Sequence, residues 1–534
     1  MKLILYSLKN YYYVAAPFLI AAYTVLFHYV QNQHEYTLSV LITPLVLALL
    51  FAALIIFLVR FFTKSLDKNV FLSSFVVLVC LSYGRFVELF KNASFKIGSF
   101  EIKPELLVAV LSGLILLGVV VLMYKIKKRF VQVDQLIAVI ALLLVGFQVY
   151  GIVSFEITSG RISRTPVSTE KIQTKNVSNV TTPDIYYFIF DRYAGPTATS
   201  EQYGFDNSAF YAHLEDLGFY VADKSRSNYP KTFLSLGSSL NMEYLDFITE
   251  QTNGGASKDE SLVTPLMENS KVLKFLKDNG YSYVHVGSWW EQTKGNKNAD
   301  YLYAPKFDEY LGADEFTTGF FNTTIASSVL KYVLRNPVNV STDPNNNIHR
   351  QAALYQFKSL EEIPSIKSPK FVFVHVLLPH DPFVFDQKCT PISEKVVKQN
   401  SHQVNYLNQL QCVNTQIKKI LDDVLKKSKN PPIIILQSDE GPFPMNSSVD
   451  SNQSWGSATD TALREKFPIM NAYYFPGVDY EDTQLYKEIS PVNSFKVLFN
   501  TYFGTDHELV EDKSYIYEDK FNYYKFKDVT DIVR

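Results

Sequence analysis

Apolar residues crowd the first part of the chain, whereas beyond about residue 155 shorter apolar runs alternate with polar ones. Five long apolar stretches stand out, most of them near the ~20 residues that a helix needs to cross a bilayer. They lie at residues 11–30, 38–59, 70–89, 106–124 and 136–155. The pattern predicts five transmembrane helices within residues 1–157. The first stretch is too long and too rich in tyrosine for a cleaved signal peptide, so we expect it to be retained.

Lysine and arginine residues predict which helix ends face the cytoplasm, because cytoplasmic loops retain positive charge. They cluster before the first stretch, after the second and after the fourth: Lys2, Lys9, Arg60, Lys64, Lys68, Lys125, Lys127, Lys128 and Arg129. An odd number of crossings that starts inside ends outside. We therefore expect a cytoplasmic N-terminus and an extracytoplasmic C-terminal part. The third stretch carries Arg85 and Glu88, for which snorkelling to the interface is favoured over a buried functional pair.

Beyond the apolar stretches the pattern changes to that of an α/β domain. Residues 158–183, rich in Ser, Thr, Lys and Asn, are typical of a linker. In residues 184–534, short β-rich runs alternate with amphipathic segments, which predicts a largely parallel central sheet flanked by helices. Strands are expected at 185–190, 281–286, 371–377 and 433–437, and covering helices at 269–279 and 404–424.

Composition adds little to this picture. A formal net charge of −2 gives no indication of a nucleic-acid partner. Cys80, Cys389 and Cys412 form no CxxC pair. If the α/β domain lies outside the cell, Cys389 and Cys412 could form a disulfide, which the sequence leaves open, as it does the oligomeric state.

Acidic and histidine residues follow three of the predicted strands. Asp191 follows the first strand, His380 follows 371–377, and Asp439 and Glu440 follow 433–437. Ligands of open α/β sheets collect at the carboxyl ends of strands. Three carboxylates gathered there would repel one another unless a cation joined them, so we expect a divalent metal site. A single Asp after a strand is more often a helix cap or a turn former.

The candidate nucleophile is Thr232. It stands just after Pro230, where a helix can begin, and the free N–H groups of a helix start favour a phosphate or sulfate. The alternative is that Thr232 is only a helix cap, a role that threonine often fills.

The order Asp191, Thr232, a histidine-rich strand end and Asp439-x-Gly resembles the alkaline phosphatase superfamily. Within it the chain resembles the five-helix lipoteichoic acid synthases and phosphoethanolamine transferases, essentially over its whole length. The resemblance implies that Thr232 is both nucleophile and metal ligand, and that Asp191, Asp439 and Glu440 complete the metal shell.

The same resemblance makes His380 a substrate-side histidine, either a hydrogen-bond donor to phosphate or the acid for the leaving alcohol. His375 is a weaker match to such a position, and a buried strand residue is an equally good interpretation. Trp289 is a candidate for a substrate pocket and Arg464 for a phosphate clamp, although packing and a solvated surface charge are the commoner roles of such residues.

The chain departs from the family pattern at two positions. Glu440 stands where the family usually has histidine, and Arg192 stands where sulfatases often have a second Asp. The first departure predicts a wholly oxygen shell, which suits Mn²⁺ or Mg²⁺, with Ca²⁺ and Zn²⁺ as alternatives. It also leaves open a decayed site. The second argues for one metal ion.

The resemblance implies a metal-dependent phosphoryl or phospho-alcohol transferase, or a phosphodiesterase, with a phospho-threonine intermediate. The expected donor is a membrane lipid or a lipid-linked molecule, and the expected acceptor an envelope glycan or lipid. An inactive binding module of envelope assembly is the alternative. A sulfate-ester hydrolase is disfavoured, because threonine cannot become formylglycine and the run Cys389-Thr390-Pro391 lacks the arginine that follows in sulfatases.

Overall fold

The computed structural model describes residues 11–33, 36, 38–90, 95–97, 100–125, 130–158, 183–252, 254–305, 315–333, 344–445 and 454–534. Residues 159–182, nearly all of the predicted linker, lie outside the described residues. The chain forms two compact units, one of Met1–Ser163 with Asp308–Thr342 and one of Arg164–Phe307 with Asp343–Arg534.

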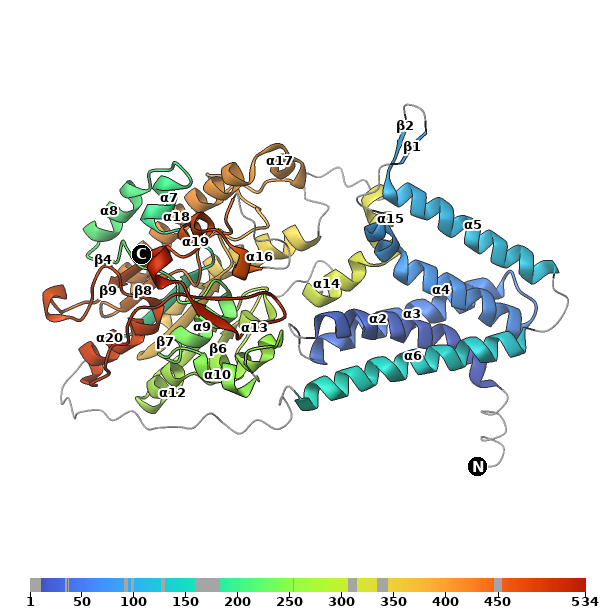
Figure 1. Cartoon of the computed structure of the whole chain (residues 1–534), viewed down its shortest axis with the longest axis horizontal. Helices are drawn as coiled ribbons and strands as arrows, with labels where there is room; N and C mark the ends of the chain where they lie inside the picture. The colour runs from blue at the N-terminus through green and yellow to red at the C-terminus, as the bar shows by residue number, and fades with distance from the viewer. Residues whose placement is uncertain are drawn as a thin grey trace. The chain divides into compact units, whose positions relative to one another are not determined.

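The first unit contains five helices, among the described residues, that are long and apolar enough to cross a membrane. They are α2 (Ala16–Asn32), α3 (Ile42–Arg60), α4 (Leu66–Leu89), α5 (Pro104–Lys125) and α6 (Val131–Thr158). Helix α2 lies against α3, α4 and α6 (Figure 1). Many of their apolar side chains remain exposed in the protein, as lipid-facing side chains do. The predicted five apolar helices are confirmed.

Two short helices far along the chain also belong to this unit: α14 (Glu315–Asn322) and α15 (Ile325–Val333). The Phe316 ring of α14 lies 5.0 Å from the His28 ring of α2, centroid to centroid. The backbone N–H of Gly84 in α4 donates to the carbonyl of Thr323 at 2.9 Å. A Cβ on Gly84 would stand 2.3 Å from the backbone oxygen of Asn322, so the close approach requires glycine there.

This arrangement differs from the expected continuous domain at 184–534. The chain leaves the α/β unit, contributes α14 and α15 to the helical unit, and returns. Both helices are far shorter than a membrane span, so the hydrophobic pattern gave no sign of them. The other boundaries, 1–157 and 158–183, stay predictions.

The second unit is built on a seven-stranded sheet with the order β4-β9-β8-β3-β7-β5-β6. Strands β3, β5, β6, β7 and β8 are parallel, and at one edge β9 runs antiparallel to both of its neighbours, β8 and β4. The predicted largely parallel sheet is therefore confirmed. The bounds are β3 (Ile185–Phe190), β4 (Tyr220–Val221), β5 (Ser282–Val286), β6 (Tyr301–Tyr303), β7 (Lys370–Val376), β8 (Ile433–Gln437) and β9 (Asn471–Tyr474).

Helices cover both faces of this sheet, as expected of buried parallel strands. Side chains of β3 alternate between two cores, Ile185, Tyr187 and Ile189 in one and the even-numbered residues in the other. The first core includes α9 (Thr232–Ser239), α12 (Lys271–Asp278) and α20 (Pro491–Phe503), and the second includes α8 (Ser208–Asp216) and α18 (His402–Lys427). The predicted helices 269–279 and 404–424 are confirmed as α12 and α18.

The remaining helices, apart from α16, and the remaining strands are short. The helices are α7 (Pro196–Glu201), α10 (Asp246–Gln251), α11 (Thr264–Glu268), α13 (Glu291–Lys294), α16 (Pro344–Ser359), α17 (Glu394–Gln399), α19 (Asp460–Lys466) and α21 (Thr530–Val533). Two hairpins complete the description, β1 (Phe95–Ile97) with β2 (Phe100–Ile102) and β10 (Tyr515–Tyr517) with β11 (Phe526–Asp528).

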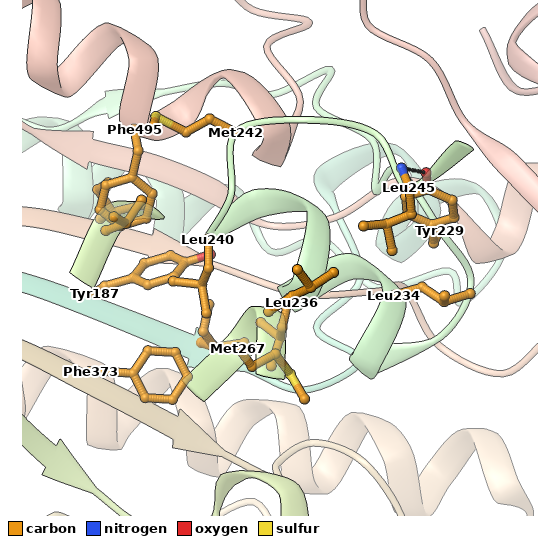
Figure 2. Packing of buried hydrophobic residues seen from close by; sticks show 14 of the residues in the cluster. Tyr187, Tyr229, Leu234, Leu236, Leu240, Met242, Leu245, Met267, Phe373 and Phe495 are labelled. Atoms are coloured by element: carbon orange, nitrogen blue, oxygen red, sulfur yellow. Dashed lines mark hydrogen bonds between the residues drawn. The ribbon is translucent and has the colours of Figure 1, made fainter. Parts of the chain in front are cut away.

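Helix α9 packs tightly on the first face. Figure 2 shows its Leu236, and Leu240 just after it, near Tyr187 of β3 and Phe373 of β7, all four in the same buried cluster. The hydroxyl of Tyr187 donates to Gln437 Oε1 at 2.7 Å, which links β3 to β8 beneath the helix. The packing therefore fixes where α9 begins relative to the strand ends.

Cys389 and Cys412 form a disulfide with a Cα–Cα distance of 4.9 Å. It ties the segment after β7 to α18. The pairing that the sequence left open is thus formed.

Candidate active site

The carboxyl ends of β3, β7 and β8 bring three side chains together. Asp191 directly follows β3, His375 is the next-to-last residue of β7, and Asp439 comes two residues after β8. Ile189 is aligned with His375 on one side and Gln437 on the other. Since strand side chains alternate, His375 lies on the face that carries α9, and Asp191 and Asp439 continue the same alternation. One ligand atom from each of the three residues lies within 4.8 Å of the others.

These groups are buried beyond what carboxylates and imidazoles normally tolerate. Asp191, His375 and Asp439 are 1%, 0% and 3% exposed. Asp191 Oδ1 and His375 Nε2 have no hydrogen-bond partner among the described residues. Orphaned buried polar atoms cost free energy of about 1–3 kcal/mol each, so this geometry fits a bound cation. Two carboxylates and one imidazole are also a chemically suitable donor set for a divalent metal.

The raised pKa values of the two aspartates also fit a bound cation. Burial, and then the neighbouring charges of Asp439 and Glu440, raise the pKa of Asp191 well above its ordinary value. Burial also raises the pKa of Asp439, although hydrogen bonding from Thr232 lowers it. A divalent cation would remove both the repulsion and the desolvation cost.

Thr232 is the first residue of α9 and is half-buried. Its hydroxyl lies near Asp439 and lowers the pKa of that carboxylate. The preceding Lys231 forms a 3.0 Å ion pair with the buried Glu260. The start of α9 is therefore held in place, with a hydroxyl beside the metal group.

His375 is held by a polar chain behind it. Its Nδ1 is hydrogen-bonded to Thr293 Oγ1 at 3.0 Å, and Thr293 Oγ1 to Ser288 Oγ at 2.8 Å. Burial lowers the pKa of His375 to about 3, so the imidazole is neutral at neutral pH. With the proton on Nδ1, the lone pair of Nε2 faces the carboxylates, the tautomer that a metal ligand needs.

Replacing Thr293 with valine is expected to weaken metal binding by about 10- to 100-fold, because the partner that sets the His375 tautomer is lost. Competition with a chelator measures the affinity, and Thr293→Ser, which keeps the hydroxyl, is the control. A valine variant that holds its metal as tightly as the unchanged protein would show that Thr293 does not orient His375.

Glu440 lies outside the metal group. Its carboxylate pairs with Arg192 Nε at 3.1 Å and with Lys466 Nζ at 3.2 Å. His375, expected on the substrate side, joins the two aspartates, whereas the described partners of Glu440 are cations. The assignment of Glu440 as a metal ligand stays a prediction, and His375 is an additional candidate ligand that offers nitrogen. Neither Arg192 nor Lys466 had been assigned a role, although Arg192 marked a departure from the family pattern.

His380 lies at the mouth of the site. Its backbone N–H donates to the carbonyl of Asp191 at 3.1 Å, and its side chain is 22% exposed beside Asp381. Burial and the nearby Arg192 lower the pKa of His380 to about 4. The His380 Nδ1 donates to the Asp381 carbonyl, so a hydrogen bond from Nε2 to a phosphoryl oxygen requires the protonated ring.

The other two expected substrate residues, Trp289 and Arg464, have other partners among the described residues. The Trp289 ring contacts His349 of α16, with 3.8 Å between ring centroids. Arg464 Nε donates to the backbone carbonyl of Ile532 at 3.0 Å, so its guanidinium binds the C-terminal segment. His349, which the sequence did not single out, has His380 among the charges that act on it.

Known proteins resemble this chain in sequence and fold. The family model described as Sulfatase matches residues 199–477. No curated protein sequence matches the chain.

Solved structures with similar folds include phosphoethanolamine transferases and a sulfatase. The C-terminal periplasmic domain of EcEptC from Escherichia coli is 12% identical, with coverage of 67% of this chain and 95% of that one and a TM-score of 0.44. The integral membrane lipooligosaccharide phosphoethanolamine transferase EptA from Neisseria meningitidis is 13% identical, with coverage of 91% and 95% and a TM-score of 0.41. The 2-O GAG sulfatase BT1596 is 14% identical, with coverage of 63% and 77% and a TM-score of 0.38.

Proposed function

Because the chain belongs to the sulfatase family of the alkaline phosphatase superfamily, we propose that it is a membrane-anchored, metal-dependent phosphoryl or phospho-alcohol transferase with Thr232 as its nucleophile. The observation that carries the proposal is the buried group of Asp191, His375 and Asp439 with the Thr232 side chain beside Asp439. Threonine cannot be converted to the formylglycine of sulfatases, which favours a phosphate ester over a sulfate ester as substrate.

Asp191, His375, Asp439 and Thr232 would hold the ion in this proposal. The nitrogen of His375 favours Zn²⁺ or Mn²⁺ over Mg²⁺ and Ca²⁺. When bound, a divalent ion supplies Lewis acidity that lowers the pKa of the Thr232 hydroxyl and offsets charge on the phosphoryl oxygens. Nucleophilic attack, orientation of the nucleophile and hydrogen bonding to the substrate are carried out by side chains of the protein.

The reaction has two displacement steps. Thr232 Oγ forms a bond to phosphorus as the bond from phosphorus to the leaving alcohol oxygen breaks, and the proton of the Thr232 hydroxyl ends on that oxygen, which gives phospho-threonine and the free alcohol. The Asp439 carboxylate, which has no hydrogen-bond partner among the described residues, would orient the Thr232 hydroxyl by accepting its hydrogen bond. An acceptor hydroxyl, or water, then displaces Thr232 from phosphorus, and its proton ends on Thr232 Oγ. His380, in its protonated form, donates a hydrogen bond from Nε2 to the phosphoryl group in both steps.

The donor is proposed to be a lipid that carries a phosphate ester, and the acceptor an envelope glycan or lipid. Five apolar helices place the chain in a membrane, where a lipid donor is concentrated. The distribution of Lys and Arg favours an extracytoplasmic α/β domain, and the disulfide fits an oxidising compartment.

The test uses the full-length chain in vesicles that contain phospholipid. Mass spectrometry of the peptide that carries Thr232 is expected to show a phosphate-containing adduct, and a chromogenic phosphodiester to be cleaved in preference to the matching sulfate ester. Faster cleavage of the sulfate ester would instead identify a sulfate-ester hydrolase. Absence of both the adduct and turnover, with metal bound, would identify an inactive binding module.

A further inference from the structure

The two positions at which the chain departs from the family pattern are joined to each other. Arg192 Nε lies 3.1 Å from Glu440 Oε1, although 248 positions separate the residues in the sequence. Lys466 Nζ lies 3.2 Å from the other carboxylate oxygen. Arg192 thus introduces a cation beside the anion that Glu440 introduces, which indicates that the two replacements serve one arrangement.

The backbone that carries Arg192 is held in an uncommon conformation. Arg192 has a φ of 59°, in the left-handed region that residues other than glycine seldom adopt. The Tyr406 hydroxyl donates to the Arg192 carbonyl at 2.8 Å, and the N–H of Tyr193 donates to Ser438 Oγ at 2.9 Å. Ser438 Oγ in turn donates to the Glu440 carbonyl at 2.7 Å. Such conformations persist where the surroundings fix them, and they often mark functional sites.

Glu440 pairs with two cations, Arg192 and Lys466. Glu440 and Lys466 are both buried, with side chains 4% and 1% exposed, so Lys466 offsets part of the Glu440 charge that Arg192 would otherwise offset alone. The guanidinium of Arg192 is 17% exposed, and its Nη1 lies 2.9 Å from Asp381. The Asp381 side chain is 51% exposed, and solvent screens an exposed partner strongly. Arg192 therefore extends from the buried Glu440 to the exposed Asp381, and its guanidinium carries positive charge at the exposed end.

We infer that Arg192 binds the anionic phosphoryl oxygens of the substrate, and that Glu440 orients its guanidinium instead of binding the metal. A guanidinium fixed on one edge by a carboxylate presents its other N–H groups in the planar geometry that phosphate oxygens accept. The inference rests on the proposed function, because it says which residue of the same site binds the negatively charged substrate. It makes Arg192 a substrate-binding residue and Glu440 a positioning residue.

The experiment compares metal content and phosphate binding in the purified full-length chain loaded with Mn²⁺. Metal is measured by elemental analysis after dialysis, and inorganic phosphate is the probe, measured by calorimetry. Arg192→Gln is expected to keep its metal and to bind phosphate about 10- to 100-fold more weakly, as loss of a charge-assisted hydrogen bond predicts. Glu440→Gln is expected to keep its metal as well. Asp439→Asn is expected to lose it.

Matched variants separate a specific effect from a general one. Arg192→Lys keeps the charge without the planar fork and is expected to bind phosphate with intermediate affinity. Arg534→Gln makes the same replacement at a side chain that is 56% exposed, and is expected to change neither the metal content nor the affinity for phosphate. Thermal unfolding of each variant verifies that it is folded.

Three outcomes have distinct meanings. Loss of metal from a folded Glu440→Gln variant would overturn the assignment of Glu440, and phosphate binding of unchanged strength in Arg192→Gln would overturn that of Arg192. Failure of the unchanged protein to bind a divalent ion would instead overturn the proposed function on which both assignments rest.

Discussion

Replacing Thr232 with alanine is expected to abolish turnover of a phosphodiester substrate, with a loss of about 10⁴- to 10⁶-fold in kcat, as removal of a catalytic nucleophile typically produces. The reason is that no covalent intermediate can form without the hydroxyl. Metal content should fall less than turnover, because Asp191, His375 and Asp439 remain. Steady-state kinetics and mass spectrometry of the Thr232 peptide measure the two effects.

Two variants control this experiment. Thr232→Ser keeps a hydroxyl at the start of α9 and should retain measurable activity and the adduct. Ser235→Ala removes another hydroxyl from the same helix, one that donates to the Tyr229 carbonyl at 3.0 Å, and should leave turnover intact. Full activity of Thr232→Ala would show that another group attacks phosphorus, or that water attacks directly.

Replacing Asp439 with asparagine is expected to remove the metal and, with it, about 10³-fold or more of the activity, because both electrostatic stabilisation and nucleophile activation depend on the ion. The effect of the replacement on the free energy of unfolding should depend on whether metal is bound. In the metal-free protein the variant should unfold at a higher temperature, since one of two buried, mutually repelling carboxylates is gone. Metal should stabilise the unchanged protein over its own metal-free form by about 2.7 kcal/mol at an ion concentration 100 times the Kd, and should leave the stability of the variant unchanged.

The pH dependence follows from the same carboxylates. Their pKa values in the folded protein are raised above the ordinary value of 3.8, so above that pH the folded state binds more protons than the unfolded state. Stability of the metal-free protein should therefore fall as pH rises from about 4. Metal competes with those protons, so its stabilising effect should grow over the same range. Calorimetry at several pH values, with and without chelator, measures both trends.

The control for this prediction is Asp223→Asn, at an exposed carboxylate that pairs with Lys487. It should alter neither the metal content nor the dependence of stability on pH.

The Asp439 prediction has its own contradicting outcome. Metal retained by Asp439→Asn at the level of the unchanged protein would contradict the proposed site.

Much of the fold could be predicted because it depends on local patterns. Bilayer-length apolar stretches and buried strands are visible in any short window of sequence. Asp191 and Asp439 were predictable as neighbours for a related reason: they follow strands, and the carboxyl ends of parallel strands meet at one edge.

The partners of His375 and Glu440 depend on the direction of each side chain, and the strand pattern predicts that direction only for His375. His375 alternates in phase with Phe371 and Phe373, so its direction could have been inferred from the strand. Glu440 lies beyond the end of β8, where alternation no longer applies, and its direction depends on pairing with Arg192 and Lys466. Such long-range ion pairs leave no periodic signal in one sequence.

The return of α14 and α15 to the helical unit has a practical consequence for protein engineering. A truncated chain that starts at residue 184 would still carry Phe316 and Phe320, whose buried surroundings come from residues of the helical unit. Secretion of such a fragment would expose apolar surface and promote aggregation. A soluble version of the α/β unit therefore requires two cuts in the gene, one before residue 184 and one that replaces residues 308–342 with a short hydrophilic loop.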